Sequence, residues 1–254
     1  MDGNPFDRDY RDTAEEVEAP RAAPKPKSGG ITYHANLIQG SDEWLQQRCG
    51  LMTASEMKLV LTPKLKIADN DKVRAHVFEL AAQRLLGHVE PHYVSDDMIR
   101  GHDDEIEARE LYGKHYAPVR EVGFITNDKW GFKLGYSPDA LVGDDGLIEC
   151  KSRRQKYQVQ TIARDEVPEE YVLQLQTGLL VSEREWIDFV SYSGGQPLYV
   201  KRVLPDPEMQ AAIIEAAGLF EQRVAACIQD YRATLAAMPV LIPTERRVEE
   251  EMRI

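Results

Sequence analysis

Apolar residues recur at helical spacing along much of the chain. The clearest case is the stretch from Asp71 to Leu86, where apolar side chains return every three or four residues and Gly87 follows as a stop signal. Ser41 precedes another such stretch as an N-cap, and Thr53 or Ser55 lies near the cap of the next. The same reasoning predicts helices over residues 41–48, 53–61, 95–116, 155–163, 168–181 and 206–236.

Short apolar runs bounded by turn residues predict strands in the second half of the chain. The sequence Asp144-Asp145-Gly146 between two of these runs is a hairpin signal. The order is helices, a β-meander, helices, two strands and a long helix, which predicts an α/β or α+β fold with helices flanking a mixed sheet. The predicted strands cover residues 117–126, 132–142, 146–152, 185–192 and 197–203.

Composition divides the chain into one folded part and two tails. Residues 1–30 end in a segment rich in Pro, Ala, Lys and Gly, so we expect a disordered or tethering tail there. Residues 31–240 then form a single domain. Residues 241–254 form a C-terminal tail that is mostly charged at its end, and we expect it to fray.

Overall composition is that of an ordinary globular protein, with 43% apolar and 29% charged residues among 254. No apolar run is long enough to span a bilayer, and the acidic N-terminus is not a secretory signal. The three cysteines are scattered and lack a CxxC pair, which argues against a disulfide framework or structural zinc and suits a reducing cytosol. The net charge of −12 speaks against nucleic acid as a partner, but screening beyond about 8 Å still allows a local basic groove.

Charged residues interrupt the apolar strand predicted over residues 146–152. Glu149 and Lys151 point to the same face, and Asp139 stands at the end of the neighbouring strand after Pro138, which fixes the backbone before it. Two carboxylates and a lysine in one place suit Mg²⁺, and a bound metal can activate water and offset charge on a phosphoryl oxygen. Lys151 would orient the water or stabilise the developing charge. A buried Glu–Lys ion pair, with Asp139 capping a turn, is the alternative.

These residues resemble the PD-(D/E)xK nuclease motif, and further stretches resemble one branch of it, the lambda-exonuclease (YqaJ-type) viral recombinase nucleases. Residues 40–57, "GSDEWLQQRCGLMTASEM", are similar to that family's Gly…Trp…Arg-x-Gly-x-x-Thr-Ala-Ser signature. Residues 101–109, "GHDDEIEAR", are similar to its Gly-x-x-x-Glu-x-x-Ala-Arg helix, and residues 171–181, "YVLQLQTGLLV", to its Gln-x-Gln helix. The resemblance implies a restriction-endonuclease-like core with a mixed central β-sheet.

The resemblance also implies roles for particular residues. Glu105 would hold the divalent metal, Mg²⁺ or Mn²⁺, together with Asp139, Glu149 and the main-chain carbonyl of Cys150, beside the catalytic Lys151. For Glu105 the alternative is a solvated helix face in an acidic stretch.

A second set of matching residues would hold a terminal 5′-phosphate. Arg48, Ser55 and Gln174 match the family's contacts, and a guanidinium forks onto phosphate oxygens. A surface arginine, a plain cap and a solvent-facing glutamine are the alternatives.

Four further residues are considered as possible DNA contacts. Trp44 is expected to pack in the core rather than to stack on a base. Lys64 and Lys66, after Pro63, would track a DNA backbone by charge, or belong to a solvated loop. Met98 would be an apolar wedge at the duplex end, with plain packing as the alternative.

The resemblance implies a 5′→3′ exonuclease that degrades one strand of double-stranded DNA ends to 5′-mononucleotides. It also implies a homotrimer, a single-strand annealing protein as partner, and phage or prophage origin in the cytoplasm of a bacterial host. A RecB-type nuclease with an iron–sulfur cluster would need four thiolates, which three cysteines cannot supply. An endonuclease of the same superfamily and a non-catalytic DNA-end-binding or scaffold subunit are the remaining alternatives.

Overall fold

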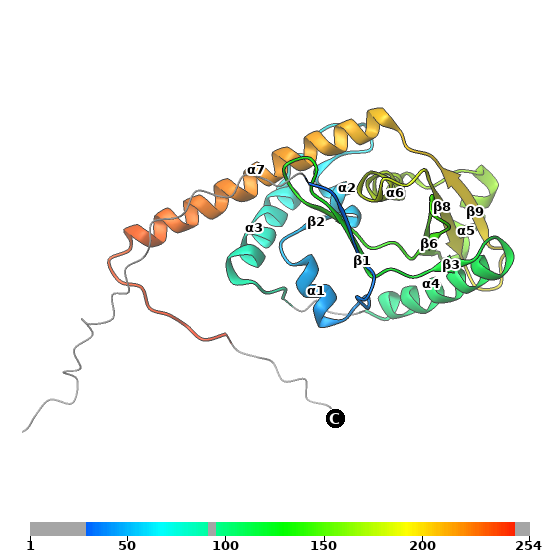
Figure 1. Cartoon of the computed structure of the whole chain (residues 1–254), viewed down its shortest axis with the longest axis horizontal. Coiled ribbons are helices and arrows are strands. Elements are labelled where there is room, and N and C mark those ends of the chain that lie inside the picture. The colour runs from blue at the N-terminus through cyan, green and yellow to red at the C-terminus, as the bar shows by residue number, and fades with distance from the viewer. Residues whose placement is uncertain (1–28, 91–94, 247–254) are drawn as a thin grey trace, which may run out of the picture.

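Two β-sheets lie at the centre of the fold, and helices cover them (Figure 1). The structure is a computed structural model that describes residues 29–90 and 95–246. The four-stranded sheet has the order β1 (Ile31–His34), β4 (Phe124–Asn127), β5 (Leu134–Tyr136) and β2 (Met52–Thr53). The five-stranded sheet has the order β3 (Val119–Arg120), β6 (Ala140–Val142), β7 (Gly146–Ser152), β8 (Trp186–Tyr192) and β9 (Tyr199–Val203).

The strand pairing confirms most of the predicted β-structure and corrects one part of it. β6 and β7 form the predicted antiparallel hairpin, with Val142 opposite Gly146, and β7 pairs with β8 in parallel, so the sheet is mixed. The two runs predicted as single strands over residues 117–126 and 132–142 are each divided between the two sheets. The second run breaks at Pro138, which has no N–H for a ladder. The short strands β1 and β2 were not predicted.

The helices match the predictions closely. The helix predicted over residues 53–61 consists of a 3₁₀ turn, Ala54–Glu56, followed by α2. Gly87 ends α3 in the left-handed region with φ of 61°, which glycine adopts without strain. The helices are α1 (Asp42–Arg48), α2 (Met57–Val60), α3 (Asp71–Leu86), α4 (Asp96–His115), α5 (Gln155–Arg164), α6 (Glu169–Ser182) and α7 (Pro207–Ala237).

The central strands of the five-stranded sheet, β6 to β8, are buried on both faces. On one face Ala108 and Tyr112 of α4 pack against Ile148, Cys150 and Val190. On the other face the alternate strand residues join a larger core that includes most of α6, which is buried from Leu175 to Ser182. Successive residues of β7 therefore face different helices, and the charged residues of this strand lie among well-packed neighbours.

The C-terminal helix projects from this body. α7 packs its first half against the core, from Ile213 to Val224, and its second half extends outward (Figure 1). Residues 29–30 and 241–246 are exposed and have no helix or strand, while the rest of the predicted tails lies outside the described residues. Among the described residues no helix has the length and apolarity that crossing a bilayer requires.

Candidate active site

Glu149 and Lys151 form a nearly buried ion pair on β7. Lys151 Nζ lies 2.7 Å from Glu149 Oε1, and the Glu149 residue is 2% exposed. The other carboxylate oxygen of Glu149 accepts a hydrogen bond of 2.7 Å from the Tyr136 hydroxyl, and Gln174 of α6 donates its amide to Oε1. A carboxylate with three donors is fixed in orientation, which is what a metal ligand or a water-orienting base requires.

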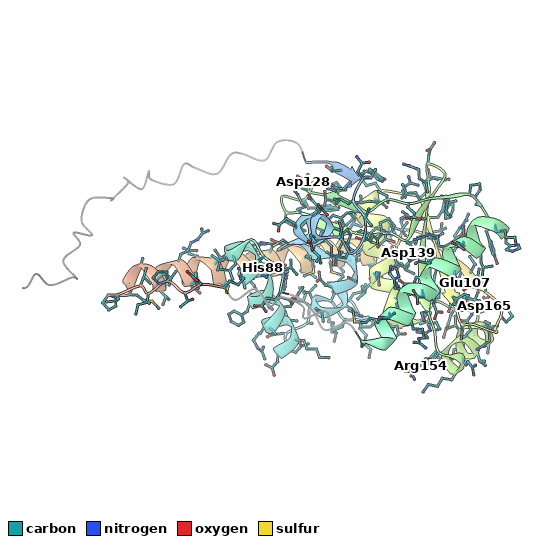
Figure 2. The ribbon with its side chains drawn as sticks, turned by 90° about the horizontal axis from the view of Figure 1, so that it is seen from below. His88, Glu107, Asp128, Asp139, Arg154 and Asp165 are labelled. Carbon is teal, nitrogen blue, oxygen red and sulfur yellow. The ribbon has the colours of Figure 1, made fainter. Side chains whose placement is uncertain are left out.

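Asp139 is held against the same strand. It lies in the segment between β5 and β6, in the interior of the molecule as seen in Figure 2. Its Oδ2 accepts a hydrogen bond of 2.5 Å from the backbone N–H of Cys150. Because Cys150 lies between Glu149 and Lys151, this bond places the Asp139 carboxylate next to both of them.

Glu105 joins the group from α4. Its Oε1 lies 3.5 Å from Lys151 Nζ, so one ammonium contacts carboxylates from two different elements. One residue earlier on the same helix, Asp104 accepts a hydrogen bond of 2.5 Å from the Ser152 hydroxyl. Two adjacent contacts thus connect α4 to the end of β7. The structure therefore brings Glu105, Asp139, Glu149 and Lys151 together.

Burial and charge set the electrostatics of this cluster. Burial raises the pKa of Asp139, and the neighbouring charge of Glu149 raises it further. Burial also raises the pKa of Glu105, although the Lys151 ammonium opposes this. Burial lowers the pKa of Lys151, but the negative charges of Glu149, Asp139 and Glu105 raise it by a larger amount. The pKa of Lys151 therefore lies above its usual value. With all three carboxylates ionised, the cluster would carry a net charge of −2, which a divalent cation would neutralise.

The donor set therefore fits a hard divalent cation by its chemistry. Within residues 29–90 and 95–246, however, no three acidic, histidine or cysteine side chains stand in a metal-binding arrangement. The Lys151 ammonium contacts the carboxylates of Glu105 and Glu149, so a bound ion would have to share them with Lys151.

A second constellation surrounds Arg48 on α1. The guanidinium lies over the Trp44 ring at 4.3 Å from its centroid and contacts the hydroxyls of Ser137 at 3.5 Å and Thr53 at 3.4 Å. Burial lowers the pKa of Arg48, partly offset by the charge of Glu56. Ser55 is exposed, and its hydroxyl lies 3.3 Å from that of Thr53. Arg48 and Ser55 thus both contact the Thr53 hydroxyl, so the structure brings these two predicted residues close together.

Gln174, predicted as a third phosphate contact, lies elsewhere in the structure. Its amide donates to Glu149, so it belongs to the carboxylate cluster rather than to the group around Arg48. Gln176 is 3% exposed and bonds to the Leu204 carbonyl at 2.8 Å and the Asp206 N–H at 2.9 Å, which makes it a link to the start of α7.

The remaining predicted contacts are exposed. Lys64 and Lys66 lie in a turn in which the Thr62 N–H bonds to the Lys66 carbonyl. Met98 on α4 is 55% exposed, so it is not part of the core. Trp44 is half-buried, but its indole N–H donates to Ser137 and Gly123, which gives it a polar role that the prediction of core packing omitted.

Sequence reasoning also missed Tyr136, Ser137 and Gln39. Gln39 donates to the Pro138 carbonyl at 2.9 Å, and Tyr136 and Ser137 immediately precede this proline. Their position beside a motif residue is the only signal the sequence offers, because their partners lie on distant segments.

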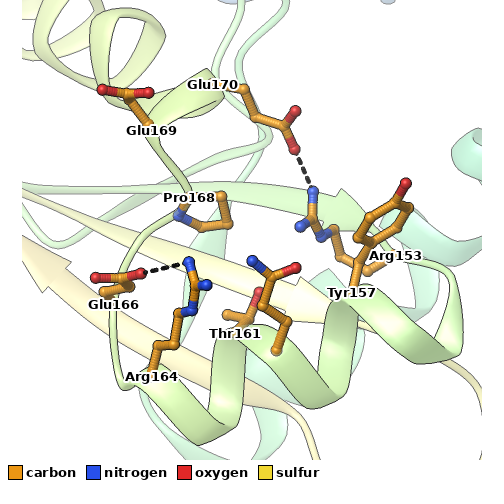
Figure 3. Close-up of a pocket in the computed structure, with 9 residues that line it drawn as sticks. Arg153, Tyr157, Thr161, Arg164, Glu166, Pro168, Glu169 and Glu170 are labelled. Carbon is orange, nitrogen blue, oxygen red and sulfur yellow. Dashed lines mark hydrogen bonds and ion pairs between the residues drawn. The ribbon is translucent and has the colours of Figure 1, made fainter.

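A hollow of about 370 Å³ opens between α5 and the start of α6 (Figure 3). Its first lining residue, Arg153, follows Lys151 of the carboxylate cluster by two positions in the sequence. Arg153 and Arg164 line it, and each is paired with a carboxylate, Glu170 and Glu166 respectively. Since both guanidiniums are already neutralised, this hollow does not have the free positive charge that a phosphate backbone needs.

Comparisons with known proteins bear on the family and the fold of the chain. Residues 43–185 match the model of the YqaJ-like viral recombinase domain. The chain is similar to the alkaline exonuclease LHK-Exo from Laribacter hongkongensis, with 31% identity, a TM-score of 0.68 and coverage of 77% of this chain and 98% of that one.

A structure of LHK-Exo in complex with dAMP gives 32% identity, a TM-score of 0.69 and the same coverage. A phage related exonuclease from Haemophilus somnus, at 14% identity and a TM-score of 0.51 over 71% of this chain and 96% of that one, is similar in fold. No curated protein matches.

Proposed function

The chain belongs to the YqaJ-like viral recombinase domain family, and from this premise we propose that it is a metal-dependent 5′→3′ exonuclease acting on double-stranded DNA ends. It would release 5′-mononucleotides and leave a 3′ single strand. The observation that carries the proposal is the convergence of Glu105, Asp139 and Glu149 on Lys151 from three separate segments.

A divalent cation, Mg²⁺ with Mn²⁺ as a substitute, would be held by the three carboxylates and the Cys150 carbonyl. Bound there, it supplies a Lewis acid for phosphodiester oxygens and lowers the pKa of bound water. Tyr136 and Gln174 keep Glu149 in one orientation through their hydrogen bonds. Lys151 donates to the attacking water or to the developing negative charge on the phosphoryl group, because its ammonium stays protonated beside the carboxylates.

Arg48 and Ser55 would bind the terminal 5′-phosphate. The Arg48 guanidinium has N–H groups in a planar fork, and Ser55 presents an exposed hydroxyl nearby. We assign Gln174 to orienting Glu149 instead. LHK-Exo has been captured with dAMP, which is the class of product that this pocket and cluster would release.

DNA contacts and partners follow from the same proposal. Lys64 and Lys66 would track the backbone, and exposed Met98 would contact the end of the duplex. We further propose a homotrimer that encloses the DNA, so that only its bore has to be basic although the chain carries −12. The product strand would pass to a single-strand annealing protein in the cytoplasm of the bacterial host.

Digestion of linear and covalently closed circular duplex tests the proposal against its alternatives. We expect Mg²⁺-dependent release of mononucleotides from linear DNA, none from the circle, and none from either in EDTA. Cutting of the circle would make the chain an endonuclease. End binding without release in Mg²⁺ and in Mn²⁺ would make it a scaffold subunit.

A further inference from the structure

Residues 136–139 contact both halves of the candidate active site. Tyr136 donates to Glu149 and Asp139 accepts from the Cys150 N–H, so the two ends of this segment hold the carboxylate cluster. Ser137, between them, faces the other way and accepts hydrogen bonds from Trp44 Nε1 at 3.0 Å and Arg48 at 3.5 Å. One short segment therefore joins the phosphate pocket to the carboxylates.

The segment also connects the two sheets, because β5 ends at Tyr136 and β6 begins at Ala140. Gln39 donates to the Pro138 carbonyl at 2.9 Å, and proline restricts the backbone here. The position of Asp139 thus depends on contacts with residues 39–48 on one side and with β7 on the other.

Trp44 links this segment to Arg48 on the phosphate side. Its ring lies against the Arg48 guanidinium, and its indole N–H is bonded to Ser137 and to the Gly123 carbonyl at 3.1 Å. A phosphate that binds Arg48 therefore contacts a side chain that is stacked on Trp44. Trp44 is in turn hydrogen-bonded to Ser137, which lies two residues before Asp139.

We infer that Trp44 and Ser137 are positioning residues that couple occupancy of the 5′-phosphate pocket to the placement of Asp139. The inference rests on the proposed function and extends it. A 5′-phosphate on Arg48 would hold α1 and, through Trp44 and Ser137, the 136–139 segment in the hydrolytic arrangement. The advantage of a phosphorylated end then appears in kcat as well as in KM, because the phosphate improves the arrangement of the cluster and not only binding.

The test measures kcat and KM on duplexes with 5′-phosphate and 5′-hydroxyl ends. Trp44→Phe keeps the aromatic face under Arg48 and removes the N–H, and Ser137→Ala removes the acceptor. We expect each variant to lower the ratio of kcat between phosphate and hydroxyl ends by about tenfold, the value of one hydrogen bond. Ser137→Thr, which restores a hydroxyl, should recover the ratio. The exposed Gln46→Ala on the same helix is the matched control and should keep the wild-type ratio.

Two results separate this inference from the proposed function. If wild type shows no preference for phosphorylated ends, or Arg48→Ala keeps it, the phosphate pocket itself is wrong. If Arg48→Ala removes the preference while folded Trp44→Phe and Ser137→Ala retain it, the coupling is overturned and the pocket stands. An equal fall of kcat on both ends in Ser137→Ala would also overturn it, since Ser137 would then only shape the Asp139 turn. Thermal melting of each variant identifies any that fail to fold, and the second variant then decides.

Discussion

The ammonium of Lys151 lies 2.7 Å from the carboxylate of Glu149, two residues away on the same face of β7. The same nitrogen lies 3.5 Å from Glu105 on α4. In the described structure, this lysine therefore supplies the positive charge nearest to two of the three clustered carboxylates. Any cation that binds here must share those carboxylates with Lys151, and this competition leads to the first prediction.

Lys151→Met should abolish hydrolysis and yet make the protein more dependent on divalent ions for its stability. Removing one partner of a buried ion pair costs about 3–5 kcal/mol, because Glu149 is left without its counter-charge. We expect a lower melting temperature in EDTA, with a larger recovery on adding Mg²⁺ than wild type shows. Lys114→Met, at an exposed site on α4, is the control. Equal melting temperatures for both variants in EDTA would rule out this account of Lys151.

Asp139→Asn should stabilise the metal-free protein while inactivating it. The amide oxygen can still accept the Cys150 N–H, but one of three converging negative charges is gone. Relief of about 1 kcal/mol of repulsion corresponds to a melting temperature about 2–4 °C higher in EDTA. Mg²⁺ should then stabilise the variant less than wild type. A lower melting temperature in EDTA would mean that the Asp139 charge is not repelled by its neighbours.

Arg48→Lys should keep part of the preference for 5′-phosphorylated ends. Lysine supplies the charge but not the planar fork, so we expect a loss of about tenfold in kcat/KM on phosphorylated ends, against about a hundredfold for Arg48→Ala. Rates on 5′-hydroxyl ends should change little in either variant. If both variants lost activity equally on the two kinds of end, Arg48 would have no phosphate-specific role.

Gln174→Ala should affect kcat and Gln176→Ala should affect stability, although the two residues lie only two positions apart on α6. Gln174 orients Glu149, so its loss should lower kcat by about tenfold on both kinds of end with little change in stability. Gln176 satisfies two buried backbone groups, so its loss should cost about 1–3 kcal/mol of stability and spare kcat. A defect in Gln174→Ala confined to phosphorylated ends would return this residue to the phosphate pocket.

The sequence predicted the strand–strand part of the cluster because that part depends on local geometry. The hairpin of β6 and β7 brings Asp139 beside Glu149, and strand alternation puts Glu149 and Lys151 on one face. Glu105 could be placed only by family resemblance, because no local pattern relates a helix residue to a strand more than forty positions later. The start of α1 followed from the cap Ser41, whose side chain accepts a hydrogen bond from the Trp44 N–H in the first turn.

The contacts of Tyr136, Ser137 and Gln39 could not be predicted in the same way. Each joins segments that no local pattern relates, and Ser137 and Trp44 are 93 positions apart. Pro138 was recognised as a backbone constraint, but its effect of dividing one predicted strand between two sheets depends on the packing of both. The hydrogen bond from Gln174 to Glu149 was not predicted for a related reason, since helical periodicity left the direction of Gln174 open between two neighbouring surfaces.

A time course on one doubly labelled duplex tests the central claim most directly. The substrate carries a 5′-phosphate, one label near the 5′ terminus and another near the 3′ terminus of the same strand. With wild type and Mg²⁺, we predict that the 5′ label is released first as mononucleotide, that EDTA stops release, and that Asp139→Asn binds the end but releases nucleotides about 10³-fold more slowly. Release by Asp139→Asn at the wild-type rate, or loss of the 3′ label first, would contradict the account.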